Sequence, residues 1–169
     1  MRVLVTYASK HAATAGIAKA LGTVLREESD HGLDVDVFPV DEVAGVEDYD
    51  AVVIGSAVYM GRWMDTARGL VRRNEKALRG RPVWLFSSGP LGEPAVPAQD
   101  AADGSDLAEK LGARAHRTFA GSLRRAELGR GERLAVRLVN APEGDYRDWL
   151  DIRHWGEEIA DALSAPVEV

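Results

Sequence analysis

Cysteine is absent from this chain of 169 residues. Its absence excludes disulfides, thiolate metal sites, cysteine-bound iron–sulfur clusters and a cysteine nucleophile. Any redox chemistry must therefore come from a bound cofactor. Long apolar runs are missing too, since the short one after Met1 has neither the length of a signal peptide nor that of a membrane span. We expect a cytoplasmic protein, and the chain length predicts a single domain over residues 1–169.

Net positive charge is also lacking, because the formal charge is −6 at pH 7. This balance disfavours indiscriminate binding to nucleic acid. A local arginine-rich stretch is interpreted as a solvated helix face in preference to a docking site for an anionic partner; it contains Arg124, Arg125, Arg130, Arg133 and Arg137. The histidines are scattered without the spacing of metal ligands, so no metal site is expected.

Short apolar runs alternate with segments of helical period along the chain. Strands are expected near residues 3–5, 33–37, 51–55, 82–86 and 118–123. Helices are expected from Thr14 to about residue 27, and near residues 67–78, 105–111, 126–139 and 152–163. This alternation predicts an α/β fold with a doubly wound, five-stranded parallel sheet, right-handed crossovers and helices on both faces.

Three loops leave the carboxyl ends of the expected strands, where doubly wound sheets bind their ligands. In the first loop, the start of a helix offers free backbone N–H groups, and the hydroxyls of Ser9 and Thr14 add donors that suit a phosphate. An ordinary capped helix explains the same residues without a ligand. The second loop sets Tyr59 and Trp63 beside Gly61, so that aromatic rings are available to stack on a flat heterocycle or to pack in the core.

The third loop, residues 87–92, supplies hydroxyls and accessible backbone amides. Each of the three loops is a weak signal by itself. Because all three belong to one edge of the expected sheet, together they indicate a ligand site at that edge.

Four segments of the chain carry a resemblance to a known family: residues 7–14, 52–61, 119–123 and 144–149. In these segments the sequence resembles the flavodoxin superfamily, and more narrowly the flavodoxin-domain proteins related to menaquinone-dependent protoporphyrinogen oxidase. The resemblance covers most of the chain and weakens between Gly92 and Gly112. It implies a flavodoxin-like sheet with strand order 2-1-3-4-5.

The resemblance also implies a cofactor, flavin mononucleotide (FMN), and the residues that hold it. Its phosphate would be bound by Ser9, Lys10, His11, Ala12, Ala13 and Thr14. Its isoalloxazine ring would be flanked on one side by Ser56, Ala57, Val58, Tyr59, Met60, Gly61 and Trp63, and on the other by Ser87, Ser88, Gly89, Pro90, Leu91 and Gly92. Relatives usually have glycine where this chain has Ala12, and alanine would cost about 1 kcal/mol if that position needs a positive φ. A deazaflavin presents a phosphate and a flat ring to the same loops, and stays open as an alternative.

The function implied is that of an FMN-binding redox protein, either an electron-transfer protein or an FMN-dependent oxidoreductase. Its partner would be a redox protein or a small-molecule or quinone acceptor, and no catalytic acid or base is assigned. Two alternatives remain: a menaquinone-linked protoporphyrinogen IX oxidase, and a flavin-free binding or regulatory module on the same fold. The broader redox function is preferred because residues 92–106 lack the basic and aromatic character of the quinone-linked oxidase. The motif at 145–149 is interpreted as helix capping with buried aromatics in preference to a substrate site.

Overall fold

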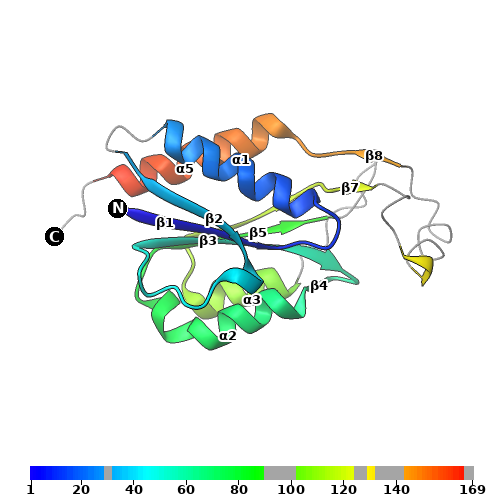
Figure 1. Cartoon of the computed structure of the whole chain (residues 1–169), viewed down its shortest axis with the longest axis horizontal. Coiled ribbons are helices and arrows are strands. Elements are labelled where there is room, and N and C mark those ends of the chain that lie inside the picture. Colours follow the sequence, from blue (N-terminus) through cyan, green and yellow to red (C-terminus); the bar gives the residue numbers. More distant parts are fainter. Residues whose placement is uncertain (29–31, 90–101, 124–128, 132–142, 166–169) are drawn as a thin grey trace.

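A parallel sheet forms the centre of the computed structural model, which describes residues 1–28, 32–89, 102–123, 129–131 and 143–165 (Figure 1). Its strands are β1 (Arg2–Ala8), β2 (Asp34–Pro39), β3 (Ala51–Tyr59), β5 (Val83–Ser88) and β6 (Ala115–Phe119). They lie in the order β2-β1-β3-β5-β6, and the short strand β4 (Arg62–Trp63) pairs antiparallel with the end of β3. With β4 set aside, this is the predicted order 2-1-3-4-5, so the predicted fold class is confirmed.

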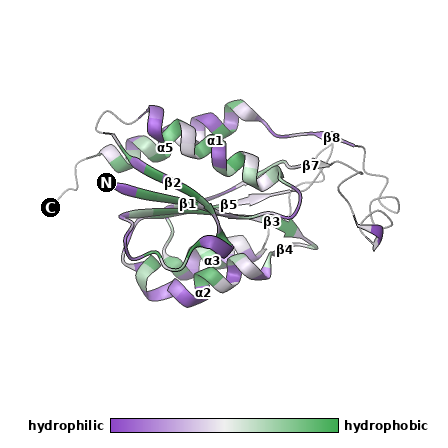
Figure 2. Ribbon diagram, viewed as in Figure 1, coloured by the Kyte–Doolittle hydropathy of each residue, from purple (hydrophilic) through white to green (hydrophobic). Residues whose placement is uncertain are grey.

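Helices cover both faces of this sheet (Figure 1). On one face lie α1 (Ala13–Glu27) and α5 (Trp149–Ser164), and on the other lie α2 (Asp65–Arg79) and α3 (Ala102–Leu111). A 3-10 helix, η1 (Val40–Glu42), follows β2. Figure 2 shows hydrophobic residues along β1 and alternating hydrophobic and hydrophilic residues along α1 and α2, as expected of a buried strand and of amphipathic helices.

Two apolar cores lie on opposite faces of the sheet, because successive side chains of a strand point to opposite sides. Val3 and Val5 of β1 belong to the core beneath α1 and α5, which includes Trp155. Leu4, between them, belongs to the core beneath α2, which includes Leu70. All three β1 side chains are fully buried. The continuous apolar run in the sequence therefore marks a strand covered on both faces, as predicted.

The expected fifth strand, residues 118–123, is wrong in its bounds. Strand β6 ends at Phe119, and Ser122–Leu123 forms a separate strand, β7, which pairs antiparallel with β8 (Gly144–Asp145). The segment Ala115–Phe119 is half-buried up to its last residue because β6 lies at the edge of the sheet. It consequently has no apolar run by which the sequence could mark it.

The remaining helix boundaries are close to those expected, with α3 starting earlier than the predicted 105. Nearly all of the helix expected over 126–139 lies outside the described residues. Within the part of the chain that is described, no helix combines the length and the apolar character needed to cross a membrane.

Candidate functional site

The three predicted loops begin side by side at the carboxyl edge of the sheet. Ala8 at the end of β1 is in register with Ser56 of β3, and Ala57 is in register with Ser88 of β5. The structure thus brings together the starts of all three loops. The far part of the third loop, Pro90, Leu91 and Gly92, lies outside the described residues.

The first loop is closed by backbone hydrogen bonds where α1 begins. The N–H of Ala13 donates to the carbonyl of His11 at 2.8 Å, and the N–H of Gly16 donates to the carbonyl of Ala12 at 2.9 Å. Ala12 has a φ of 61° and a ψ of −13°, and its side chain makes no capping hydrogen bond. This position therefore does require the left-handed region, which glycine adopts more easily than alanine.

Two buried hydroxyls of the first loop lack partners. Neither Ser9 Oγ nor Thr14 Oγ1 has a hydrogen-bond partner among the described residues, and Thr14 is only 1% exposed. An unpaired buried polar group costs about 1–3 kcal/mol, and folded proteins retain few of them. The first turn of α1 also carries no acidic side chain to balance its positive end. A phosphate would supply acceptors for both hydroxyls and for the free N–H groups, so the residues present fit one.

The second loop is a tight hairpin whose tip is open to solvent. Tyr59 pairs with Arg62, so Met60 and Gly61 form the two-residue turn, with φ values of 51° and 75°. Two consecutive positive φ values are typical of a type I′ turn. Met60 is fully exposed and Tyr59 is 40% exposed. Lys10 of the first loop lies with its Nζ 5.9 Å from the centre of the Tyr59 ring, which joins the first two loops.

Trp63 is turned into the protein instead of toward the ligand edge. It is 2% exposed, and its indole Nε1–H donates to Ser87 Oγ at 2.8 Å. Ser87 Oγ in turn shares a 2.8 Å hydrogen bond with Nε2 of His116 in β6. The backbone N–H of Trp63 donates to Asp103 of α3 at 3.2 Å. Of the two roles considered for Trp63, the structure shows packing, and these bonds fasten the hairpin to β5, β6 and α3.

Neither His116 nor Asp103 was among the predicted site residues, since they come from separate elements and form no sequence motif. After Ser87, the third loop continues with Ser88, which is buried, and with Gly89, whose φ of 123° is natural only to glycine. The Gly89 N–H donates to the carbonyl of Phe119 at 2.9 Å. The described start of this loop is thus tied to β6.

A fourth segment, which was not among the predicted site residues, also reaches the first loop. Residues 144–149 run from β8 to the start of α5, and Arg147 Nη1 lies 3.4 Å from the carbonyl oxygen of Ala13. The resemblance of this segment to the flavodoxin-domain proteins was the only sequence signal that pointed to it.

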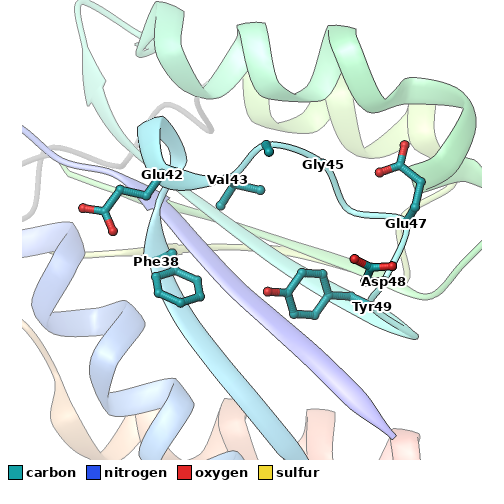
Figure 3. Close-up of a pocket in the computed structure, with 8 residues that line it drawn as sticks. Phe38, Glu42, Val43, Gly45, Glu47, Asp48 and Tyr49 are labelled. Carbon is teal, nitrogen blue, oxygen red and sulfur yellow. The ribbon is translucent and has the colours of Figure 1, made fainter.

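A hollow of about 480 Å³, to whose lining these loops do not contribute among the described residues, lies beside the edge strand β2 (Figure 3). It is lined by the end of β2, η1 and the segment that leads to β3, and three of its side chains are acidic: Glu42, Glu47 and Asp48. Carboxylates repel a phosphate, so this hollow does not suit a nucleotide cofactor. Tyr49, which lines it, donates its hydroxyl to Asp36 at 3.0 Å; burial and this hydrogen bond raise the pKa of Tyr49.

Solved structures of similar fold include flavodoxins and larger enzymes. A flavodoxin from the domain Archaea is 15% identical, with 98% of this chain and 100% of that chain covered and a TM-score of 0.65. Megasphaera elsdenii flavodoxin is 20% identical, with 94% and 98% covered and a TM-score of 0.61. For the rubredoxin oxygen:oxidoreductase of Desulfovibrio gigas the identity is 13%, the coverage 99% of this chain and 37% of that chain, and the TM-score 0.66. At such low identities these likenesses show the fold alone.

No curated protein matches the sequence closely enough to be counted as a relative. The family comparison is decisive, because residues 4–149 match a family model described as a flavodoxin domain. That range starts within β1, runs through β8 and contains all three ligand-edge loops. The chain therefore belongs to the flavodoxin-domain family, for which FMN is the implied cofactor.

Proposed function

We propose that this protein is an FMN-binding electron-transfer protein that holds the phosphate in residues 9–14 and the isoalloxazine ring between residues 56–61 and the loop that begins at Ser87. The observation that carries the proposal is the pair of unpartnered, buried hydroxyls of Ser9 and Thr14 at the start of α1. When bound, FMN supplies the redox chemistry, and the chain binds it, orients it and limits its contact with water.

Each loop contributes a different kind of contact in this proposal. Ser9, Thr14 and the backbone N–H groups at the start of α1 bind the phosphate, and Lys10 adds positive charge. Tyr59 and Met60 offer exposed apolar surface that a flat ring would cover. The backbone of the hairpin tip at Met60 and Gly61 is the natural partner of the reactive edge of the flavin. Trp63 is left out of the contact set because it is buried.

Electron transfer is preferred over substrate turnover because electron transfer needs no catalytic acid or base, and none is assigned in this chain. The partner would be a redox protein or a small-molecule or quinone acceptor, and we place the protein in the cytoplasm. The test uses protein loaded with FMN and freed of excess cofactor. A flavoprotein reductase with its nicotinamide donor should bleach the absorbance of the bound flavin, and an added acceptor should restore it. Bound flavin that stays oxidised while free FMN is reduced would refute the electron-transfer role.

A narrower candidate is a menaquinone-linked protoporphyrinogen IX oxidase, which the resemblance at residues 7–14, 52–61, 119–123 and 144–149 favours. Turnover of protoporphyrinogen IX with menaquinone by the FMN-loaded protein would support it, and reduction by a reductase without such turnover would favour simple electron transfer. A flavin-free module is favoured by a different observation, the φ of 61° at Ala12. Colourless protein that fails to quench the fluorescence of added FMN would support that alternative.

A further inference from the structure

We propose that Arg147, which lies outside the three ligand-edge loops, provides a fixed positive charge for the phosphate site at the start of α1. This inference rests on the proposed function, because it assigns a residue to the same phosphate. It concerns a segment, residues 144–149, for most of which the sequence favoured helix capping with buried aromatics.

Residues 144–149 are anchored at both ends as they pass the first turn of α1. At one end, the N–H of Tyr146 donates to the carbonyl of Gly121 at 3.1 Å. At the other, the Asp148 carboxylate caps α5 by accepting from the N–H groups of Leu150 and Asp151 at 3.0 and 3.1 Å. Capping therefore explains Asp148 but leaves Arg147 unexplained.

The Arg147 guanidinium is held from several sides. Asp145 accepts from its Nε at 2.8 Å and from its Nη2 at 2.6 Å. The Trp149 ring centre lies 4.5 Å from its central carbon, and the carbonyl of Ala13 lies 3.4 Å from Nη1. The Arg147 side chain is only 13% exposed. A guanidinium fixed in this way loses little further conformational freedom when an anion binds near it.

Gly16, at the end of the first turn of α1, leaves room for this guanidinium. A Cβ at Gly16 would lie 2.3 Å from Arg147 Nη1, closer than two such atoms can approach. Glycine inside a helix is less favourable than alanine because it loses more backbone freedom on folding. The close approach of Arg147 explains why position 16 is glycine.

The electrostatics of the site point to an anion. The positive end of α1 and the Arg147 guanidinium lie together beside Ala13, and the first turn of α1 has no acidic residue. A cation beside a helix N-terminus is unfavourable by itself. A phosphate bound by Ser9 and Thr14 would offset both positive groups. A purely structural clasp between residues 144–149 and α1 would not require a cation at the positive end of the helix.

The test compares the dissociation constants of FMN and riboflavin, which differ by the phosphate alone. In Arg147→Gln the affinity for FMN should fall about tenfold while that for riboflavin stays the same, since only the phosphate loses an interaction. Arg153→Gln is the matched control, because it removes the same charge from an arginine that pairs with Glu28, at the other end of α1. That variant should keep the wild-type ratio of the two affinities.

Gly16→Ala is a second variant, which displaces the guanidinium without removing it. If Arg147→Gln does not fold, the test rests on the result for Gly16→Ala. This variant should lower the FMN-to-riboflavin ratio in the same direction, while the alanine favours the helix itself. If Arg147→Gln folds, or otherwise if Gly16→Ala does, an unchanged ratio of FMN affinity to riboflavin affinity would overturn the role of Arg147. Equal losses of affinity for both ligands would also overturn it, because they indicate a structural clasp. Wild-type protein that binds neither flavin would instead refute the proposed function itself.

Discussion

The left-handed backbone conformation of Ala12 lowers the stability of the folded protein, and a single substitution can measure by how much. With a φ of 61°, Ala12 bears a strain of about 1–2 kcal/mol that glycine would not. Ala12→Gly removes this strain but also increases the conformational entropy of the unfolded chain, which offsets about 0.4–1 kcal/mol of the stability gained. We therefore expect the free energy of unfolding in urea to rise by about 0.5 kcal/mol.

The control for this substitution is Ala15→Gly, which lies in the regular part of α1. There glycine relieves no strain, so the free energy of unfolding should fall by about 1 kcal/mol. Similar losses in both variants would mean that Ala12 is not strained in the folded protein.

A second prediction for a single residue concerns Tyr49 and the dependence of protein stability on pH. Burial first, and then the hydrogen bond to Asp36, raise the pKa of Tyr49 above its usual value of 10.0. The folded state therefore holds the Tyr49 proton more tightly than the unfolded state, so the associated stability is complete below about pH 10 and is lost as the pH rises through the folded pKa.

Urea unfolding of the wild type and of Tyr49→Phe between pH 9 and pH 11 measures this effect. The wild type should lose stability more steeply with rising pH than the variant, which has no phenol at this position. Parallel curves for the two proteins would contradict the assigned environment of Tyr49.

At the scale of elements, one chain of side-chain hydrogen bonds joins the β3–β4 hairpin to its neighbours. Ser87→Ala would leave the indole N–H of Trp63 without its acceptor and His116 without its serine partner. An unpaired buried donor costs about 1–3 kcal/mol, so the variant should lose about 2 kcal/mol of unfolding free energy. The measurement is urea denaturation, and Ser88→Ala, at the next position of β5, is the matched control. If both serines can be replaced at the same small cost, this chain of bonds does not hold the hairpin.

The elements that the sequence predicted well are those whose burial leaves a periodic pattern. The apolar runs at residues 3–5, 51–55 and 82–86 marked β1, β3 and β5, because these strands are covered on both faces. The bounds of β6 were predicted poorly, since this half-buried edge strand has no apolar run. The pairing of β7 with β8 depends on residues far apart in sequence, which no local pattern reveals.

For the molecule as a whole, the parallel sheet explains why the predicted loops meet. Loops that leave neighbouring parallel strands at their carboxyl ends share one edge, so the sequence alone was enough to place residues 9–14 and 56–61 at one edge of the sheet. Arg147 could not be assigned in this way, because it approaches α1 from the opposite end of the sequence. Its place depends on how the segment after β8 crosses the first turn of the helix.

The central claim is that the buried hydroxyls at the start of α1 bind the phosphate of FMN. The most direct measurement is a titration of the purified protein with FMN, followed by flavin fluorescence, for the wild type and for Thr14→Val. Valine keeps the shape of threonine but removes the unpartnered Oγ1, so the ligand-free variant should be at least as stable as the wild type. We predict saturable binding by the wild type and roughly tenfold weaker binding by the variant. No binding by the wild type at tens of micromolar FMN, or equal binding by both proteins, would contradict the account.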